Sequence, residues 1–307
     1  MSPFIVGGSQ EALENEIADL ELRLQKARDR LATSKTGPGH PGRQPPPAIP
    51  SEPSSSSAHH YLLLLSDSAL PLGSFAFSSG LESYLAHTRR RGGPSITSSA
   101  AASASSFSSF LPLSLSSYAS TTLPFVLAAH RDPTPASVAA LDDMQDAAVI
   151  CTVGRRASVA QGRALLSIWE KSMASTADPS ASLAPYAELL RSAPKREGGG
   201  GEPPAAHAHL APLFGAVGAL CGLALRQTAY VFMLGHVKAL VSAAVRAGLF
   251  GPYQAQRILA GAEVQGLLAE VIEREWDTPV EEAGQSVPVM DLWFGRHELL
   301  YSRIFNS

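Results

Sequence analysis

The strongest constraint on this chain is a long stretch of sequence with almost no charge. No residue in the range 208–225 is charged, and the segment 227–246 that follows carries few charges. Only other helices or lipid can surround such helices on all sides. Pro212 and the glycines weaken a membrane span, and a central arginine such as Arg226 costs roughly 2.5–3.5 kcal/mol there. We therefore predict two central bundle helices; an integral membrane protein that uses residues 208–248 is the alternative.

The remaining periodic segments also indicate helices. Residues 253–276 place an apolar residue at i, i+3, i+4, i+7 and i+8, beginning at Val264, which is typical of a helix packed on a core. Residues 138–172 carry a similar face. The central segment 227–246 ends at Gly248, and Pro252 follows, as is common after helices. No run alternates with period two, so we predict an all-α fold with a single helical bundle-like domain.

The chain divides into three parts. Residues 1–34 carry an a/d heptad stripe on a charged helix, which could pair with itself, lie on a partner or stay solvated. Residues 35–58 are a linker rich in Pro, Gly and Ser, with too little apolar surface to order it. We predict an all-helical domain over 59–307, with flexible insertions near 92–122 and 174–207. The first insertion is rich in Ser and Ala, and its apolar residues could still pack as a poor helix.

Composition excludes several classes of function. Charged residues make up 17% of the chain and the formal net charge is −3, so nothing indicates nucleic acid or a membrane surface as a partner. Cys151 and Cys221 lie in apolar runs without a CxxC motif, which predicts two reduced core thiols. No secretory signal is visible, so we expect a cytoplasmic protein.

Motifs for catalysis or nucleotide binding are missing from the sequence. It contains no GxxxxGK[ST], GxGxxG or GxSxG motif. His297-Glu298 lacks the second histidine of HExxH, because Tyr301 stands there. The pairs His59-His60 and His207/His209 are predicted to be solvated loop histidines, and His236 a satisfied core histidine. We predict no catalytic, cofactor-binding or metal-binding residue; a metal-dependent hydrolase that uses His297, Glu298 and the loop histidines is the alternative.

Two clusters are unusual for a purely structural chain. Residues 66–82 are rich in turn residues, hydroxyls and aromatic rings, which a capped helix–turn–helix corner would also explain. The C-terminal residues 291–307 contain Trp, Phe, Tyr and Arg, the composition of interface hot spots. A tail folded back on its own core is the alternative. We expect a tail that is mobile in the free protein, because its aromatic residues need a partner surface to cover them.

Five segments in order resemble the urease accessory protein F (UreF) family. The first is LLLLSDSALPLGSFAFSSGLESYL at 62–85, which is similar to the N-terminal signature of the family. The other four are LDDMQDAAVICTVGRRASVAQGRALL, HLAPLFGAVGALCGL, LVSAAVRAGLFGPYQAQRIL and MDLWFGRHELLYSRIFNS. The sequence departs from the pattern of the family in three places. The extension 1–58 has no counterpart in the compact core, the Ser/Ala-rich stretch near 95–122 replaces what should be ordinary helix, and the loop at 174–206 is an insertion.

The resemblance implies a urease accessory protein, or chaperone, and not an enzyme. Members are all-helical and tend to form homodimers. They bind the D/H-type accessory protein, and the pair recruits the G-type GTPase to apo-urease, so that the complex inserts nickel. The F protein is proposed to control GTP hydrolysis by its partner. No cofactor is expected to bind tightly, because nickel is handled by the complex.

The resemblance also implies where partners bind. Arg303 matches the arginine that helps to fix the C-terminal segment of the family on the D/H-type partner, and the turn SSGLE matches a region implicated in the surface that faces the GTPase. The residues predicted to bind partners are Arg296, His297, Glu298, Tyr301, Arg303, Phe305, Ser78, Ser79, Gly80 and Glu82.

Overall fold

The computed structural model describes residues 24–25, 55–90, 100–177, 182–192 and 206–306. The chain forms two compact units, residues 1–51 and 52–307. Residues 24–25 are helical, and the rest of the predicted heptad helix lies outside the described residues, as does the linker up to residue 54. The described part of the chain contains helices and no strand, so the all-α prediction is confirmed.

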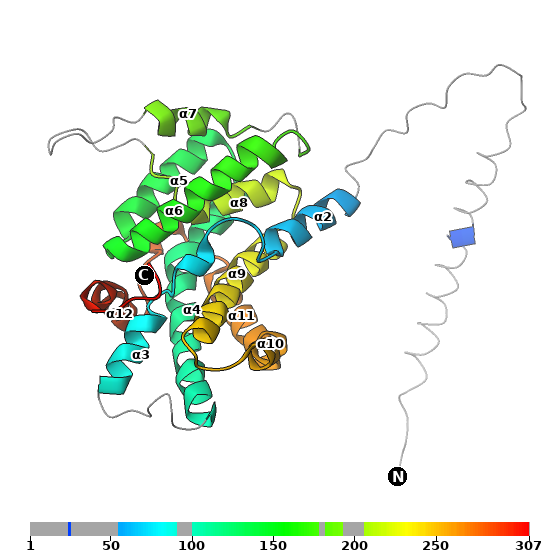
Figure 1. Cartoon of the computed structure of the whole chain (residues 1–307). Coiled ribbons are helices and arrows are strands. Elements are labelled where there is room, and N and C mark those ends of the chain that lie inside the picture. Colours follow the sequence, from blue (N-terminus) through cyan, green and yellow to red (C-terminus); the bar gives the residue numbers. More distant parts are fainter. Residues whose placement is uncertain (1–23, 26–54, 91–99, 178–181, 193–205, 307) are drawn as a thin grey trace, which may run out of the picture. The chain divides into compact units, whose positions relative to one another are not determined.

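The second unit is an array of helices (Figure 1). The longer helices are α2 (Ser55–Ser66), α3 (Leu81–Arg90), α4 (Ala100–Arg131), α5 (Pro135–Ala148), α6 (Thr152–Ile168), α7 (Ala184–Ser192), α8 (Leu210–Leu220), α9 (Leu225–Arg246), α10 (Pro252–Ala260), α11 (Ala262–Glu275) and α12 (Val289–Arg296). The described residues of this unit also contain four single turns: η1 (Ser74–Ala76), η2 (Trp169–Met173), η3 (Val280–Glu282) and η4 (His297–Leu299).

Helix α4 lies at the centre of the unit and packs against α5, α8, α9 and α11. Phe107, Phe110, Leu115 and Leu123 are among its fully buried side chains. The prediction of a flexible insertion near 92–122 is therefore wrong from residue 100 onward. Several of its hydroxyl groups form hydrogen bonds within the helix: that of Thr121 donates to the carbonyl oxygen of Ser117, four residues earlier, at 2.7 Å.

Helices α8 and α9 form the rest of the core, as their low charge predicted. Small residues on α8 let its neighbours approach. A Cβ atom on Gly215 would lie 2.2 Å from the carbonyl oxygen of Val126 on α4. A Cβ atom on Gly218 would lie 2.6 Å from the side chain of Thr228 on α9. Gly222 follows α8 in a turn with φ of 74°, a conformation that favours glycine, and a Cβ atom there would lie 3.8 Å from Cβ of Ala58 on α2.

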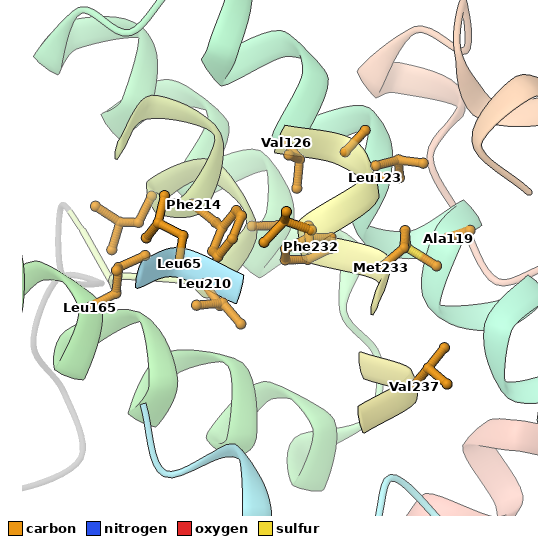
Figure 2. Close-up of a cluster of buried hydrophobic side chains, with 14 of the residues drawn as sticks. Leu65, Ala119, Leu123, Val126, Leu165, Leu210, Phe214, Phe232, Met233 and Val237 are labelled. Atoms are coloured by element: carbon orange, nitrogen blue, oxygen red, sulfur yellow. The ribbon is translucent and has the colours of Figure 1, made fainter. Parts of the chain in front are cut away.

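The apolar core gathers side chains from most of the helices. Figure 2 shows part of it, where residues from α2, α4, α6, α8 and α9 meet. Leu65, Leu123, Leu165, Phe214 and Met233 each come from a different one of these five helices and are buried. The core is continuous, so segments far apart in the sequence depend on the same packing.

Three predicted boundaries differ from the structure. The segment 253–276 breaks at Gly261, whose extended backbone (φ −69°, ψ 145°) separates α10 from α11. The predicted insertion 174–207 contains α7, which packs on α5 with Tyr186 fully buried; residues 178–181 and 193–205 lie outside the described residues. The predicted linker 35–58 ends early, because α2 begins at Ser55.

Helix α9 is, by length and composition alone, the one described helix that could cross a membrane. Core helices of proteins in water pass the same test. In this chain 61% of the apolar window of α9 is buried, and the helix packs against α2, α4, α8, α10 and α11. The prediction of a central bundle helix accounts for its low charge.

Candidate partner-binding site

The turn between α2 and α3 is built from local hydrogen bonds and left-handed glycines. The carboxylate of Asp67 accepts a hydrogen bond from the backbone N–H of Ala69 at 2.9 Å, as an Asx turn does. Gly73 turns the chain with φ of 73°. The hydroxyl oxygen of Ser78, three residues before α3, accepts a hydrogen bond from the backbone N–H of Glu82 in the first turn of that helix, at 3.3 Å. The predicted helix–turn–helix corner therefore describes this segment.

The C-terminal residues lie on that turn. Helix α12 packs against α3, α4 and α6. Gly80, which has φ of 84°, passes directly beneath α12: a Cβ atom there would lie 3.4 Å from Cβ of Trp293 and 3.6 Å from the ring of Phe294. Trp293 also packs against Tyr84 of α3, with ring centroids 4.9 Å apart. A larger residue at position 80 would meet this helix.

Glu82 joins the turn to the tail. One carboxylate oxygen lies 3.0 Å from Nε2 of His297 and accepts from the backbone N–H of Phe305 at 3.3 Å. The other accepts from the backbone N–H of Ile304 at 2.7 Å. A carboxylate accepts hydrogen bonds only, so the neutral form of His297 must carry its proton on Nε2. The Glu82 side chain therefore binds both ends of the segment 297–305.

The last residues are held from a second side. The backbone N–H of Asn306 donates to the carbonyl oxygen of Ala76 at 2.8 Å. The guanidinium of Arg246, at the end of α9, lies 4.3 Å from the ring centroid of Phe305 and donates to the carbonyl oxygen of Phe75. The Phe305 side chain is buried as a result.

These contacts contradict the expectation of a mobile tail. Met290, His297 and Phe305 are buried, and the tail is folded back on its own core. The expectation assumed that no surface of the chain would cover the aromatic residues. The turn at residues 74–82 and the end of α9 provide that surface, although they lie far away in the sequence.

The outer face of the tail remains open to solvent. Leu299 is 82% exposed, Ile304 is 61% exposed and the Tyr301 side chain is fully exposed. Charged residues lie among them: Glu298 pairs with Arg156 of α6 and with Arg303, whose Nη1 is 3.0 Å from its carboxylate. The hydrogen bond from Arg156 is the main cause that holds the pKa of Glu298 below its usual value.

The ten residues predicted to bind partners therefore divide into two groups. Arg296, Glu298, Tyr301 and Arg303 are exposed on the tail. Ser78, Gly80, His297 and Phe305 are buried, and Glu82 and Ser79 are half-buried, so this group joins the turn to the tail. The structure brings the two predicted clusters together, and contact of any of these residues with a partner stays a prediction.

A groove of about 350 Å³ lies beside this surface, and no sequence pattern predicts it. The turn after α2, the middle of α4, the start of α6 and the face of α9 line it. Its walls are mainly apolar and include Phe294 of α12, with Ser114, Gln145 and Ser158 among the polar residues. The residues come from separate segments, and no local motif brings them together.

The pair His207/His209 is not solvated, which corrects the prediction. Ring atom Nε2 of His209 lies 3.0 Å from the carboxylate of Asp146, and Nδ1 lies 3.0 Å from the hydroxyl of Ser158. Burial lowers the pKa of His209 and would raise that of Asp146. The hydrogen bonds from His209 and Arg155 outweigh burial and lower the Asp146 pKa. Asp142 fixes the segment, because its carboxylate accepts from the backbone N–H groups of residues 207, 208 and 209.

Other histidines have structural surroundings. His236 is a satisfied core histidine, as predicted: its Nε2 lies 3.0 Å from the hydroxyl of Ser114, and its ring stacks on Tyr118 at 3.9 Å. His59 and His60 are exposed on helix α2 rather than in a loop. Within the residues that the structure describes, no group of three or more His, Cys, Asp or Glu side chains could hold a metal ion. Nothing in this part of the chain supports a metal-dependent hydrolase.

Known proteins resemble this chain over most of its length. A family model described as UreF matches residues 101–263. An uncharacterized urease accessory protein UreF-like of Schizosaccharomyces pombe is 38% identical over 246 residues, which cover 79% of this chain and 94% of that protein. Urease accessory protein F of Oryza sativa subsp. indica is 32% identical over 245 residues, covering 78% and 82%. That of Arabidopsis thaliana is 29% identical over 248 residues, covering 79% and 90%. The chain belongs to the UreF family of urease accessory proteins.

Proposed function

We propose that this protein is an adaptor in urease maturation. It binds the D/H-type accessory protein, and the pair brings the G-type GTPase to apo-urease so that nickel enters the active site. Nickel is cargo of the whole complex and does not bind tightly to this chain. The protein works in the cytoplasm, as a homodimer within the complex, and catalyses neither urea hydrolysis nor nucleotide hydrolysis.

The observation that carries this proposal is the exposed face of the anchored C-terminal tail. Leu299, Tyr301 and Ile304 expose apolar side chains, although the inner face of the same segment is buried. Exposed aromatic and aliphatic groups next to arginine are typical of interface hot spots. The inner face of the tail packs against the rest of the chain. The side chains of Leu299, Tyr301 and Ile304 point to solvent, so a partner can contact them.

Co-purification tests the proposal directly. The tagged full-length chain is expected to retain the cognate D/H-type accessory protein and, with it, the G-type GTPase. Tyr301→Ala should weaken the first complex by about tenfold or more, as truncation of a hot-spot residue does. Tyr253→Ala is the matched control, because Tyr253 is an equally exposed tyrosine on α10.

Two binding results would contradict the proposal. One is a purified chain that retains neither partner under conditions in which both partners are folded. The other is a Tyr301→Ala variant that binds as tightly as the Tyr253→Ala control, which would place the binding surface elsewhere. Measured GTP or urea hydrolysis by the isolated chain would contradict its assignment as an adaptor without catalysis.

A further inference from the structure

The groove contains a buried amide that the fold leaves without a hydrogen-bond partner. Gln145 of α5 lines the groove and is fully buried. Neither Oε1 nor Nε2 of its side chain has a partner among the described residues. The other described side chains with such a buried atom, those of Ser83, Tyr186 and His297, do not line the groove. The unpaired amide and the groove therefore coincide at Gln145.

An unpaired amide is unusual inside a folded protein. Most buried polar side-chain atoms have a hydrogen-bond partner, and one without a partner destabilises the fold. The glutamine amide has two N–H donors and one carbonyl oxygen, so Gln145 leaves a donor and an acceptor unsatisfied at the same place. A ligand that offers one acceptor and one donor side by side would satisfy both.

The carboxylates nearest to Gln145 along α5 have other partners. Asp142 accepts from the backbone N–H groups of residues 207–209. Asp146 pairs with Arg155 and lies 3.0 Å from the ring of His209. The surroundings therefore already hold two carboxylates, and burial disfavours any further charge. These conditions favour a neutral ligand group and disfavour an anionic one.

The walls of the groove suit an apolar body. Phe214 of α8 and Phe232 of α9, both labelled in Figure 2, line it with ring centroids 5.3 Å apart. Tyr118 of α4 also lines it and stacks on Phe232 with ring centroids 5.2 Å apart. Pockets for small molecules are mainly apolar, hold a few polar groups and enclose about 300–1,000 Å³. The groove, at about 350 Å³, has these properties.

We propose that the groove binds a neutral small molecule with an apolar body and a primary amide, or another group with the same adjacent donor and acceptor, and that Gln145 binds this group. The torsions of the glutamine side chain let its amide turn toward the groove. The paired groups then make two hydrogen bonds away from water. This site is separate from the exposed face of the tail, so the proposal does not depend on the function proposed above.

The first measurement compares three probes of similar size on the purified full-length chain. Hexanamide donates and accepts, butyl methyl ketone only accepts, and hexanoate is an anion. We expect hexanamide to bind at least about tenfold more tightly than either of the other two, because a site with buried donors and acceptors rejects a ligand that leaves one unpaired. Titration followed by ligand-observed NMR gives the three affinities. Equal affinities, or no binding of hexanamide, would overturn the proposal.

A variant then tests the role of Gln145. Gln145→Met keeps the approximate size of the side chain and removes its donors and acceptor. In this variant hexanamide should bind no more tightly than the ketone. Gln161→Met is the matched control, because Gln161 also lines the groove but its Nε2 already donates to the carbonyl oxygen of Ala157 at 3.1 Å. A preference for hexanamide that survives in Gln145→Met would show that another residue binds the amide.

The last measurement is the melting temperature, with and without the probe. Gln145→Met removes an unpaired polar group, so without a probe it should melt about 2 °C or more above the unaltered chain, whereas Gln161→Met should not. Saturating hexanamide should raise the melting temperature of the unaltered chain and leave that of Gln145→Met unchanged. If Gln145→Met melts at the same or a lower temperature, the protein or an ordered water already satisfies the amide, and the proposal is wrong.

Discussion

Two carboxylates each fix a segment that has no regular helix of its own. Asp142 accepts from three consecutive backbone N–H groups at residues 207–209, at 2.5, 3.1 and 2.6 Å. Glu82 accepts from two backbone N–H groups and one imidazole of the tail. In both places the acceptor lies more than sixty positions away in the sequence. In each case one side chain thereby fixes several groups of a short irregular segment at once.

Asp142→Asn should therefore destabilise the fold strongly. The amide that replaces the carboxylate turns a donor toward backbone N–H groups, and each buried donor left without an acceptor costs about 1–3 kcal/mol. We expect a loss of about 3–5 kcal/mol in the free energy of unfolding, measured by urea denaturation. Asp143→Asn is the control, because its side chain is exposed on the same helix. Equal stability of the two variants would show that the 207–209 segment does not depend on Asp142.

His236 should make the stability of the fold depend on pH. Burial lowers its pKa to about 3, whereas the unfolded chain has the usual pKa near 6.5. Between these values the unfolded state binds more protons, so the free energy of unfolding falls as the pH falls from about 6.5 toward 3. One such group contributes a slope of up to about 1.4 kcal/mol per pH unit.

The measurement compares two variants across that range. His236→Gln should reduce the slope of stability against pH, whatever its effect on stability at pH 7. His59→Gln, at an exposed position on α2, should leave the slope unchanged. Burial also lowers the pKa of His130 and His209, so part of the slope remains in both variants. Equal slopes in the two variants would mean that His236 is not buried in the neutral form.

Among the helices, periodicity and the absence of charge predicted more than the content of small polar residues did. The apolar stripe at 264–272 correctly predicted a helix packed on the core, α11. The uncharged segment 208–225 correctly predicted a buried helix, α8. The composition of the Ser/Ala-rich segment predicts a flexible insertion, which the structure contradicts. Its apolar residues Phe107, Phe110, Leu111 and Leu115 recur three to four apart, and this pattern places them on one buried face of α4. Small side chains among them allow close helix packing rather than disorder.

The contact between α4 and α8 depends on a small residue of α8, Gly215. A Cβ atom on Gly215 would lie 2.2 Å from a backbone oxygen of α4, which no change of rotamer can relieve. Gly215→Ala should cost more than about 2 kcal/mol in the free energy of unfolding, because the helices must move apart. Gly235→Ala is the control: no atom lies within 4 Å of its Cβ position, so the gain in helix propensity should leave stability equal or higher by up to about 1 kcal/mol. A thermal melt of each variant decides between these outcomes, and a tolerated Gly215→Ala would contradict the close packing.

At the scale of the whole molecule, the sequence predicted both parts of the candidate site but not that they meet. Residues 66–82 and 291–307 were recognised from composition and resemblance, each by itself. Their junction at Glu82 and His297 joins positions 215 apart, and no periodicity or local motif reports such a contact. The groove beside them cannot be predicted for the same reason, because its lining residues come from separate helices. Tertiary packing, which a single sequence does not display, decides which predicted surface is covered and which is open.

Because the turn before α3 and the end of α9 cover the inner face of the tail, the tail is part of the folded body. Deletion of residues 290–307 tests this conclusion. The deletion removes the buried side chains of Met290, His297 and Phe305 and uncovers Gly80 and the start of α3. Loss of even one large buried side chain costs about 2–5 kcal/mol, and 1 kcal/mol lowers the melting temperature by about 2–4 °C in a domain of this size. We expect the melting temperature to fall by about 5 °C or more. Deletion of residues 1–51 is the control, because this segment forms the separate unit, so its removal should leave the melting of the body unchanged. If the tail deletion melts at the same temperature as the control, the tail contributes no stability, and the earlier expectation of a tail that orders only on a partner would be correct.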